Sequence, residues 1–140
     1  MSKINIYLSG NMTPSPKYYD EWTRNFAKSL QLYTDKYYCS KSEPKVGAKL
    51  IVQHDLARLR KCDIVVANLG VTDKKHHLTG MIVELYEAIK QHKVVYAFTG
   101  DGMKRSDQAN SPWMSEFISY EFDCEDDLFQ HLQVSESLMV

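Results

Sequence analysis

Residues 63–69 read DIVVANL, and this stretch decides the class of fold. It is apolar at nearly every position, as a central strand of a parallel sheet is when helices cover both faces. A half-exposed antiparallel strand would instead alternate between apolar and polar residues. The stretch therefore predicts an α/β protein.

Strand and helix patterns alternate along the rest of the chain. Further strands are expected at residues 3–9, 36–40, 92–100 and 119–122, and helices at 17–33, 48–61, 78–89, 112–117 and 126–132. The polar, glycine-containing residues 101–111 are expected to form a mobile loop. This alternation predicts one domain, residues 1–140, with a doubly wound, flavodoxin-like sheet of about five parallel strands flanked by helices.

Composition excludes several classes of partner. The 140 residues carry a formal net charge of −1 and no basic stripe, so we expect neither nucleic acid nor a membrane as partner. The three cysteines are scattered and no signal-peptide pattern precedes the first strand, which predicts a cytoplasmic protein with reduced thiols.

No cofactor or metal is expected. The chain has no Walker loop, no GxGxxG turn and no GxSxG elbow, which argues against mononucleotide hydrolysis, dinucleotide redox chemistry and serine esterase activity. His76 and His77 are adjacent on a predicted loop and are poorly placed to bind one metal ion together.

Residues 78–89, LTGMIVELYEAI, form a predicted helix that contains an unusual carboxylate. Its apolar residues recur at helical spacing as a buried stripe: Met81, Ile82, Leu85, Ala88 and Ile89. Glu84 lies at the edge of that stripe, where partial burial is unfavourable for a charge that has no partner or function. A favourable interaction with the helix dipole near the helix start is the alternative explanation.

Asp55 is a second carboxylate in an apolar setting. On a helical wheel of residues 48–61 it falls among four apolar residues: Ile51, Val52, Leu56 and Leu59. Either it is held by a buried ion pair or a hydrogen bond from a neighbouring loop, or it has a function. Burial raises the pKa of a carboxyl group, which suits a proton donor.

Tyr7 lies on the first predicted strand. The carboxyl ends of parallel strands border one cleft, so the loops after Leu8, Leu69 and Phe98 are expected to meet there. Two carboxylates and a tyrosine at such a cleft suit the cleavage of a glycosidic bond. One carboxylate would act as nucleophile or stabilise the cationic sugar, and another acid would protonate the leaving group.

Three motifs, in this order, resemble the nucleoside 2-deoxyribosyltransferase superfamily: IYLSG at 6–10, DLARLRKCDIVVANL at 55–69 and GMIVEL at 80–85. That superfamily includes deoxynucleoside 5′-monophosphate N-glycosidases and related CMP hydrolases. The resemblance extends over roughly residues 3–100. It implies an enzyme that acts on the N-glycosidic bond of a small nucleoside or nucleotide.

The resemblance also implies roles for individual residues. Glu84 matches the nucleophile that forms a glycosyl-enzyme intermediate, and Asp55 matches the acid that engages the leaving base. Tyr7 matches the tyrosine that hydrogen-bonds the nucleophile and supports the sugar. Gly10 matches a glycine that lets the backbone approach the substrate.

Further residues are expected at the substrate: Asn11, Leu78, Thr79, Gly80 and Ser111. In the relatives a dimer brings a neighbour's loop into the site, and Ser111 resembles a serine that contributes across that interface. The resemblance therefore implies a homodimer or an assembly of dimers.

The chain departs from its relatives just before the nucleophile. Six residues earlier the transferases have an acid and the monophosphate hydrolases a serine, whereas this chain has Leu78. Met81 replaces the usual threonine after the glycine. Three functions therefore stay open: a deoxyribosyltransferase-like enzyme, a nucleoside 5′-monophosphate N-glycosidase, and a nucleotide-binding or sensing domain without turnover.

Overall fold

The computed structural model describes residues 4–10, 21–24, 26–28, 37–39, 48–73, 75 and 78–135. In chain order its elements are β1 (Ile6–Gly10), β2 (Tyr37–Cys39), α2 (Ala48–Arg60), β3 (Ile64–Asn68), β4 (Gly70–Val71), α3 (Thr79–Lys90), β5 (Val94–Phe98), β6 (Lys104–Arg105), the 3₁₀-helix η1 (Asp107–Asn110), α4 (Pro112–Glu116), β7 (Tyr120–Phe122) and α5 (Glu125–Ser135). Residues 21–24 and 26–28 are also helical.

Five of these strands form one parallel sheet in the order β2-β1-β3-β5-β7. This order is that of a flavodoxin-like, doubly wound sheet, with the change of direction between β1 and β3. The predicted fold class is therefore confirmed. The central strand predicted at residues 63–69 is Ile64–Asn68, and all five of its residues are buried.

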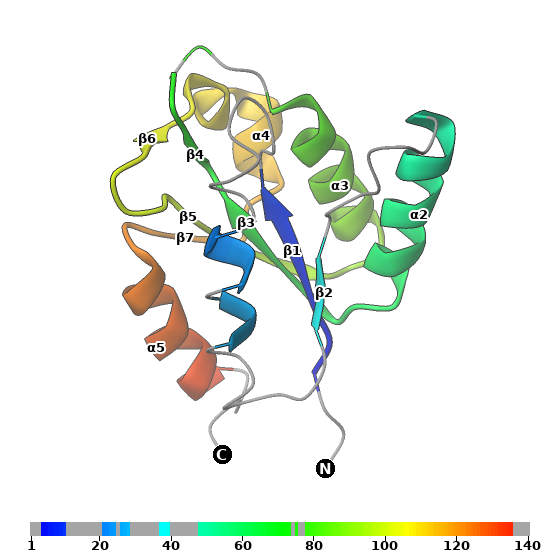
Figure 1. Cartoon of the computed structure of the whole chain (residues 1–140), viewed down its shortest axis with the longest axis horizontal. Coiled ribbons are helices and arrows are strands. Elements are labelled where there is room, and N and C mark those ends of the chain that lie inside the picture. The colour runs from blue at the N-terminus through cyan, green and yellow to red at the C-terminus, as the bar shows by residue number, and fades with distance from the viewer. Residues whose placement is uncertain are drawn as a thin grey trace.

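Helices cover both faces of the sheet, as Figure 1 shows. One core lies between the sheet and α2, α3 and α4, where Tyr7, Leu59 and Leu85 are fully buried. The other lies between the sheet and the helical residues 21–24 and 26–28 with α5, where Phe26 and Leu128 are fully buried. Successive residues of a strand point to opposite faces, so the apolar runs in the sequence serve both cores.

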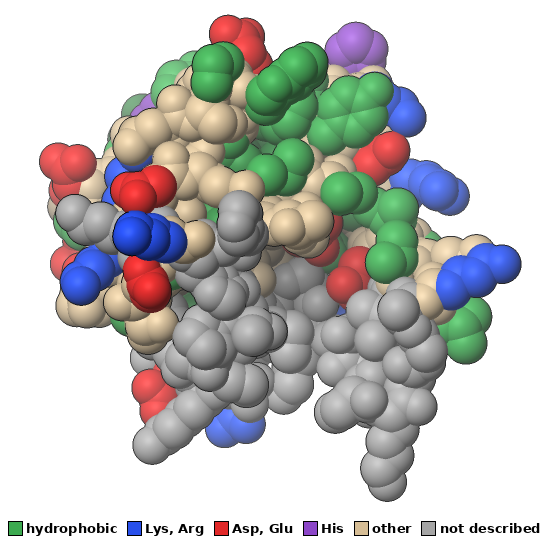
Figure 2. Space-filling model, turned by 90° about the horizontal axis from the view of Figure 1, so that it is seen from above, with side chains coloured by type: hydrophobic (Ala, Val, Ile, Leu, Met, Phe, Trp, Pro, Cys, Tyr) green, Lys and Arg blue, Asp and Glu red, His purple; other side chains and the backbone are tan. Residues whose placement is uncertain are grey.

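Large apolar side chains remain exposed on the three helices of the first layer. They are Leu50 and Val52 on α2, Val83 and Tyr86 on α3, and Trp113 on α4. Figure 2 looks onto the carboxyl ends of the strands, and hydrophobic side chains gather on that face with carboxylates among them. The predicted helix at residues 17–33 falls mostly outside the described residues.

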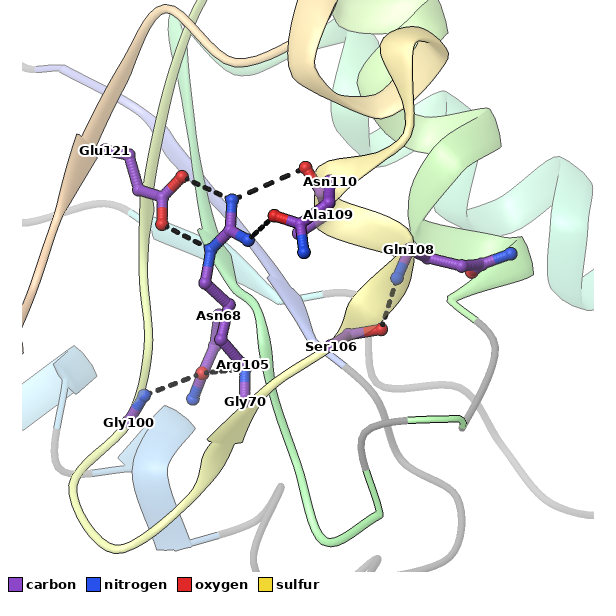
Figure 3. A network of polar contacts seen from close by, with 9 residues as sticks. All are labelled: Asn68, Gly70, Gly100, Arg105, Ser106, Gln108, Ala109, Asn110 and Glu121. Carbon is purple, nitrogen blue, oxygen red and sulfur yellow. Dashed lines mark hydrogen bonds and ion pairs between the residues drawn. The ribbon is translucent and has the colours of Figure 1, made fainter.

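Residues 101–111, predicted as a mobile loop, contain short regular elements. β6 pairs with β4 in a two-stranded antiparallel sheet, and η1 and the N-cap of α4 follow directly. The guanidinium of Arg105 donates to both carboxylate oxygens of Glu121, at 2.7 and 3.0 Å, and also contacts Asn110 and the carbonyl of Ala109 (Figure 3). In the sequence, the polar residues of this segment indicate a loop exposed to solvent. In the fold, they form hydrogen bonds with one another instead.

Gly10 and Gly80 differ in what surrounds them. A Cβ atom on Gly10 would lie 2.5 Å from the ring of Trp22, so the end of β1 needs glycine. A Cβ atom on Gly80 would meet nothing within 4 Å. The first glycine is explained by packing, and the second is not.

We therefore expect opposite effects from two alanine substitutions. Gly10→Ala should lower the free energy of unfolding by about 1–3 kcal/mol, because the indole ring must move. Gly80→Ala should raise it by about 0.5 kcal/mol, because the unfolded chain loses freedom and the helix loses nothing. Urea unfolding of the two variants measures both effects, and equal losses in the two variants would contradict the packing described here.

Candidate active site

Helix α3 brings Glu84 to two hydroxyl groups of strand β1. Tyr7 donates a hydrogen bond to Oε2 of Glu84, and Ser9 donates one to Oε1 at 2.7 Å. The side chains of Tyr7 and Ser9 are both fully buried. Each oxygen of the carboxyl group therefore has its own donor from the same strand.

The environment changes the ionisation of Glu84. Burial raises the pKa of Glu84 to about 7, and the negative charge of Asp55 acts in the same direction. The hydrogen bonds from Tyr7 and Ser9 oppose this rise, because they favour the charged form. Near neutral pH both forms of this carboxyl group are populated.

Asp55 lies on α2, half-buried, and close enough for its charge to act on Glu84. Its Oδ1 atom is buried and accepts no hydrogen bond from the described residues. Burial raises the pKa of Asp55 to about 6, although His54 and Arg58 lower it. The structure therefore brings Tyr7, Asp55 and Glu84 together.

The apolar stripe around Asp55 is less buried than its sequence predicts. Leu59 is fully buried and Leu56 partly so, but Val52 is 51% exposed. Asp55 thus lies at the edge of the interface between α2 and the sheet. An acid at such an edge can meet both the protein interior and a ligand.

Ser9 is missing from the predicted site, although it donates directly to Glu84. The signal for it is the period of a strand, since residues two apart point to the same face. Tyr7 and Ser9 share the face that α3 covers. Once Tyr7 is assigned to the site, the two-residue period of the strand therefore predicts that Ser9 faces the site as well.

The start of α3 holds three predicted substrate residues. Leu78 is the N-cap residue, its side chain is buried in the core, and its backbone N–H donates to Oε1 of Gln108. Thr79 and Gly80 are exposed on the first turn. Any contact of Leu78 with a substrate would therefore involve its backbone.

The remaining predicted residues lie on other segments. Gly10 ends β1 and pairs with Asn68 of β3 at the carboxyl edge of the sheet. Ser111 is half-buried and caps α4, its Oγ accepting from the backbone N–H of Met114 at 3.1 Å. Asn11 lies outside the described residues.

Asn68 joins the loops that follow β3 and β5. Its Oδ1 accepts hydrogen bonds from the backbone N–H groups of Gly70, at 2.9 Å, and Gly100, at 3.1 Å (Figure 3). The loops after Leu69 and Phe98 were predicted to border the cleft, and the buried amide of Asn68 holds Gly70 and Gly100 in place.

In the described part of the chain, no group of three or more His, Cys, Asp or Glu residues suits a metal ion. No helix within that part is long and apolar enough to cross a membrane.

We expect Glu84 to make stability depend on pH. The folded protein keeps the proton of this group up to about pH 7, whereas the unfolded chain releases it near its ordinary value of 4.5. Between these values the folded state binds more protons, so the free energy of unfolding falls as pH rises, by up to about 3 kcal/mol. Glu84→Gln carries no charge and should lose that part of the dependence.

Urea unfolding at about pH 5 and about pH 8 tests this expectation. The variant should gain stability relative to the unmodified protein as pH rises. Glu87→Gln is the control, because it removes a carboxylate of the same helix that pairs with Lys90 at 3.2 Å. A constant difference between Glu84→Gln and the unmodified protein at both pH values would contradict the burial of a titrating Glu84.

Comparison with known proteins finds similarity in structure alone. No family model matches the chain, and no curated protein matches it in sequence. Among solved structures, a 2-desoxiribosyltransferase from Leishmania mexicana superposes with a TM-score of 0.68 at 18% identity, covering 92% of this chain and 96% of that one. A conserved protein from Enterococcus faecalis V583 gives 0.70 at 14% identity, covering 94% and 98%.

A third similar structure is the CMP N-glycosidase BcmB of Clostridium botulinum. Its TM-score is 0.59 at 14% identity, and the match covers 93% of this chain and 98% of that one. At these identities the similarity concerns the fold. The chain therefore has the fold of a 2-desoxiribosyltransferase and of a CMP N-glycosidase, as its resemblance to the nucleoside 2-deoxyribosyltransferase superfamily implied.

Proposed function

We propose that the protein is an enzyme that cleaves the N-glycosidic bond of a (2′-deoxy)ribonucleoside or its 5′-monophosphate and transfers the sugar to another base or to water. The observation that carries this proposal is the Glu84 carboxyl group, held at both oxygens by Tyr7 and Ser9, with Asp55 nearby. The fold shared with a 2-desoxiribosyltransferase and a CMP N-glycosidase supports it.

Free thiols in the described chain agree with a cytoplasmic location.

In the first step an oxygen of ionised Glu84 attacks the anomeric carbon of the sugar. A carbon–oxygen bond forms, the bond to the base nitrogen breaks, and its electron pair leaves with the base. Asp55 donates its proton to that base as the pair departs. The result is a sugar ester of Glu84 and an ionised Asp55.

In the second step water or another base attacks the same carbon. Ionised Asp55 accepts the proton that the attacking group loses, and the ester bond to Glu84 breaks. The electron pair returns to the Glu84 carboxylate, where the hydroxyls of Tyr7 and Ser9 stabilise it. Both groups then have their starting protonation states.

The assignment of roles rests on contacts. Both oxygens of Glu84 accept hydrogen bonds, which orients the group and favours its charged form, as a nucleophile requires. Asp55 keeps a buried oxygen with no donor among the described residues, so it can turn toward a leaving base. Its pKa, raised to about 6, lets Asp55 carry a proton in a fraction of the molecules near neutral pH, and that fraction with Glu84 ionised is the reactive form.

Replacing Glu84 tests the mechanism. We expect Glu84→Ala to reduce the release of base by about 10⁴-fold or more, because no covalent intermediate can form. Chromatography of free bases from a panel of nucleosides and 5′-monophosphates measures this, and circular dichroism checks that the fold survives. Glu87→Ala on the same helix is the matched control and should stay active.

The same panel distinguishes the candidate reactions. Exchange with an added free base indicates a transferase, and base release from monophosphates alone indicates a hydrolase. Full activity of Glu84→Ala would refute the covalent mechanism. Tight binding of the panel without any release of base would favour a sensing domain.

We further propose that the enzyme is a homodimer, or an assembly of dimers, formed through the exposed apolar side chains of α2, α3 and α4. Trp113, which is 76% exposed, is the largest of them and lies two residues after Ser111. Tyr86 on α3 contacts Phe117 at the end of α4, with ring centroids 5.7 Å apart, so the two helices present one surface. Exposed apolar surface of this kind is typical of protein interfaces.

Trp113→Arg should convert the dimer to a monomer, because a charged side chain would be buried at the interface without a partner. Light scattering after size exclusion measures the mass. Val134→Arg on α5 is the control, since Val134 is 82% exposed on the opposite layer and should leave the dimer intact. A monomeric unmodified protein would contradict this interface.

A further inference from the structure

Ser9 is completely buried, and its hydroxyl lies 2.7 Å from Oε1 of Glu84. Buried hydroxyl groups need a hydrogen-bond partner, and here the partner is the carboxyl group that we propose as nucleophile. We propose that Ser9 is a second positioning residue for Glu84, which holds the carboxylate in its attacking orientation and stabilises its charge. This inference rests on the proposed function.

Two hydrogen-bond donors fix the orientation of the Glu84 carboxyl group, which one donor cannot do. The last torsion of a glutamate side chain is broad, so a single hydrogen bond leaves the carboxyl group free to rotate. Tyr7 binds Oε2 and Ser9 binds Oε1, so the plane of the group is fixed at both oxygens. Both donors come from β1, which pairs with β2 on one side and β3 on the other and is therefore held rigidly.

The contact also acts during the reaction. Negative charge leaves the carboxylate as the sugar ester forms and returns when the ester breaks. A hydroxyl donor binds a charged oxygen more strongly than a neutral ester oxygen, so Ser9 favours the return of the charge. It therefore assists the departure of Glu84 from the sugar in the second step.

A thermodynamic cycle tests the contact without a substrate. Ser9→Ala is made in the unmodified protein and in the Glu84→Gln variant, and urea unfolding is followed at about pH 5 and about pH 8. At the higher pH we expect Ser9→Ala to lower the folding equilibrium constant about tenfold more in the unmodified protein than in Glu84→Gln. The reason is that only the unmodified protein has a charged carboxylate from which the substitution removes a hydrogen-bond donor. At the lower pH the two losses should be similar.

Two further variants make the cycle decisive. Ser106→Ala removes another fully buried hydroxyl, one that accepts from the backbone of Gln108 at 3.3 Å, and should give equal losses in both backgrounds. Ser9→Cys nearly keeps the volume but offers a weaker donor, and should fall between serine and alanine at the higher pH. Equal losses for Ser9→Ala in both backgrounds at both pH values would overturn the inference.

Activity gives a second readout. In Ser9→Ala the limb of the kcat/KM profile that follows Glu84, the group with the higher pKa of the pair, should move to higher pH, since the charged form of Glu84 has lost a donor. Ser106→Ala should leave that limb in place. An unmoved limb with an inactive Glu84→Ala would refute the role of Ser9 and leave the proposed function standing. An active Glu84→Ala would refute the proposed function, and the cycle would still report on the contact.

Discussion

The carboxyl group of Glu84 lies where α3 crosses β1, and two hydroxyl groups of that strand donate hydrogen bonds to it. An ionised carboxyl group in a buried position is unfavourable by several kcal/mol unless such donors compensate. The contact therefore ties the first strand to a helix more than 70 residues later in the chain. The packing of α3 on the sheet and the proposed chemistry of the site both involve the same pair of hydrogen bonds.

Glu84 and Asp55 have environments that differ in kind. Both pKa values are raised by burial, to about 7 and about 6, but only Glu84 has donors at both oxygens. Because each charge disfavours the other, the pair tends to hold one proton between pH 6 and pH 7, and the higher pKa of Glu84 places it there more often than on Asp55. The mechanism proposed above uses the other arrangement of that single proton, with Asp55 neutral and Glu84 charged.

The sequence predicted the class of fold, and three of the residues that it singled out, Tyr7, Asp55 and Glu84, lie together in the structure. Apolar runs such as residues 64–68 predict buried parallel strands, and carboxylates beside apolar stripes made Asp55 and Glu84 candidates for a site. The sequence did not predict Ser9 as a site residue, because serine is ordinary at the end of a strand. It also did not predict the pairing of Arg105 with Glu121, because the two residues are 16 positions apart and polar residues in a sequence usually indicate exposure to solvent.

The start of α3 and the position of Glu84 are held by different segments of the fold. Leu78 turns its side chain into the core, and its N–H binds Gln108 of η1, a segment held by Arg105. The first turn is therefore positioned by contacts with the region after β5, whereas Glu84, further along the same helix, is positioned by β1. Changes in the η1 segment can then move the residues nearest the helix start and leave Glu84 in place. In the proposed enzyme this arrangement would let residues near the helix start vary with the substrate while the proposed nucleophile stays fixed.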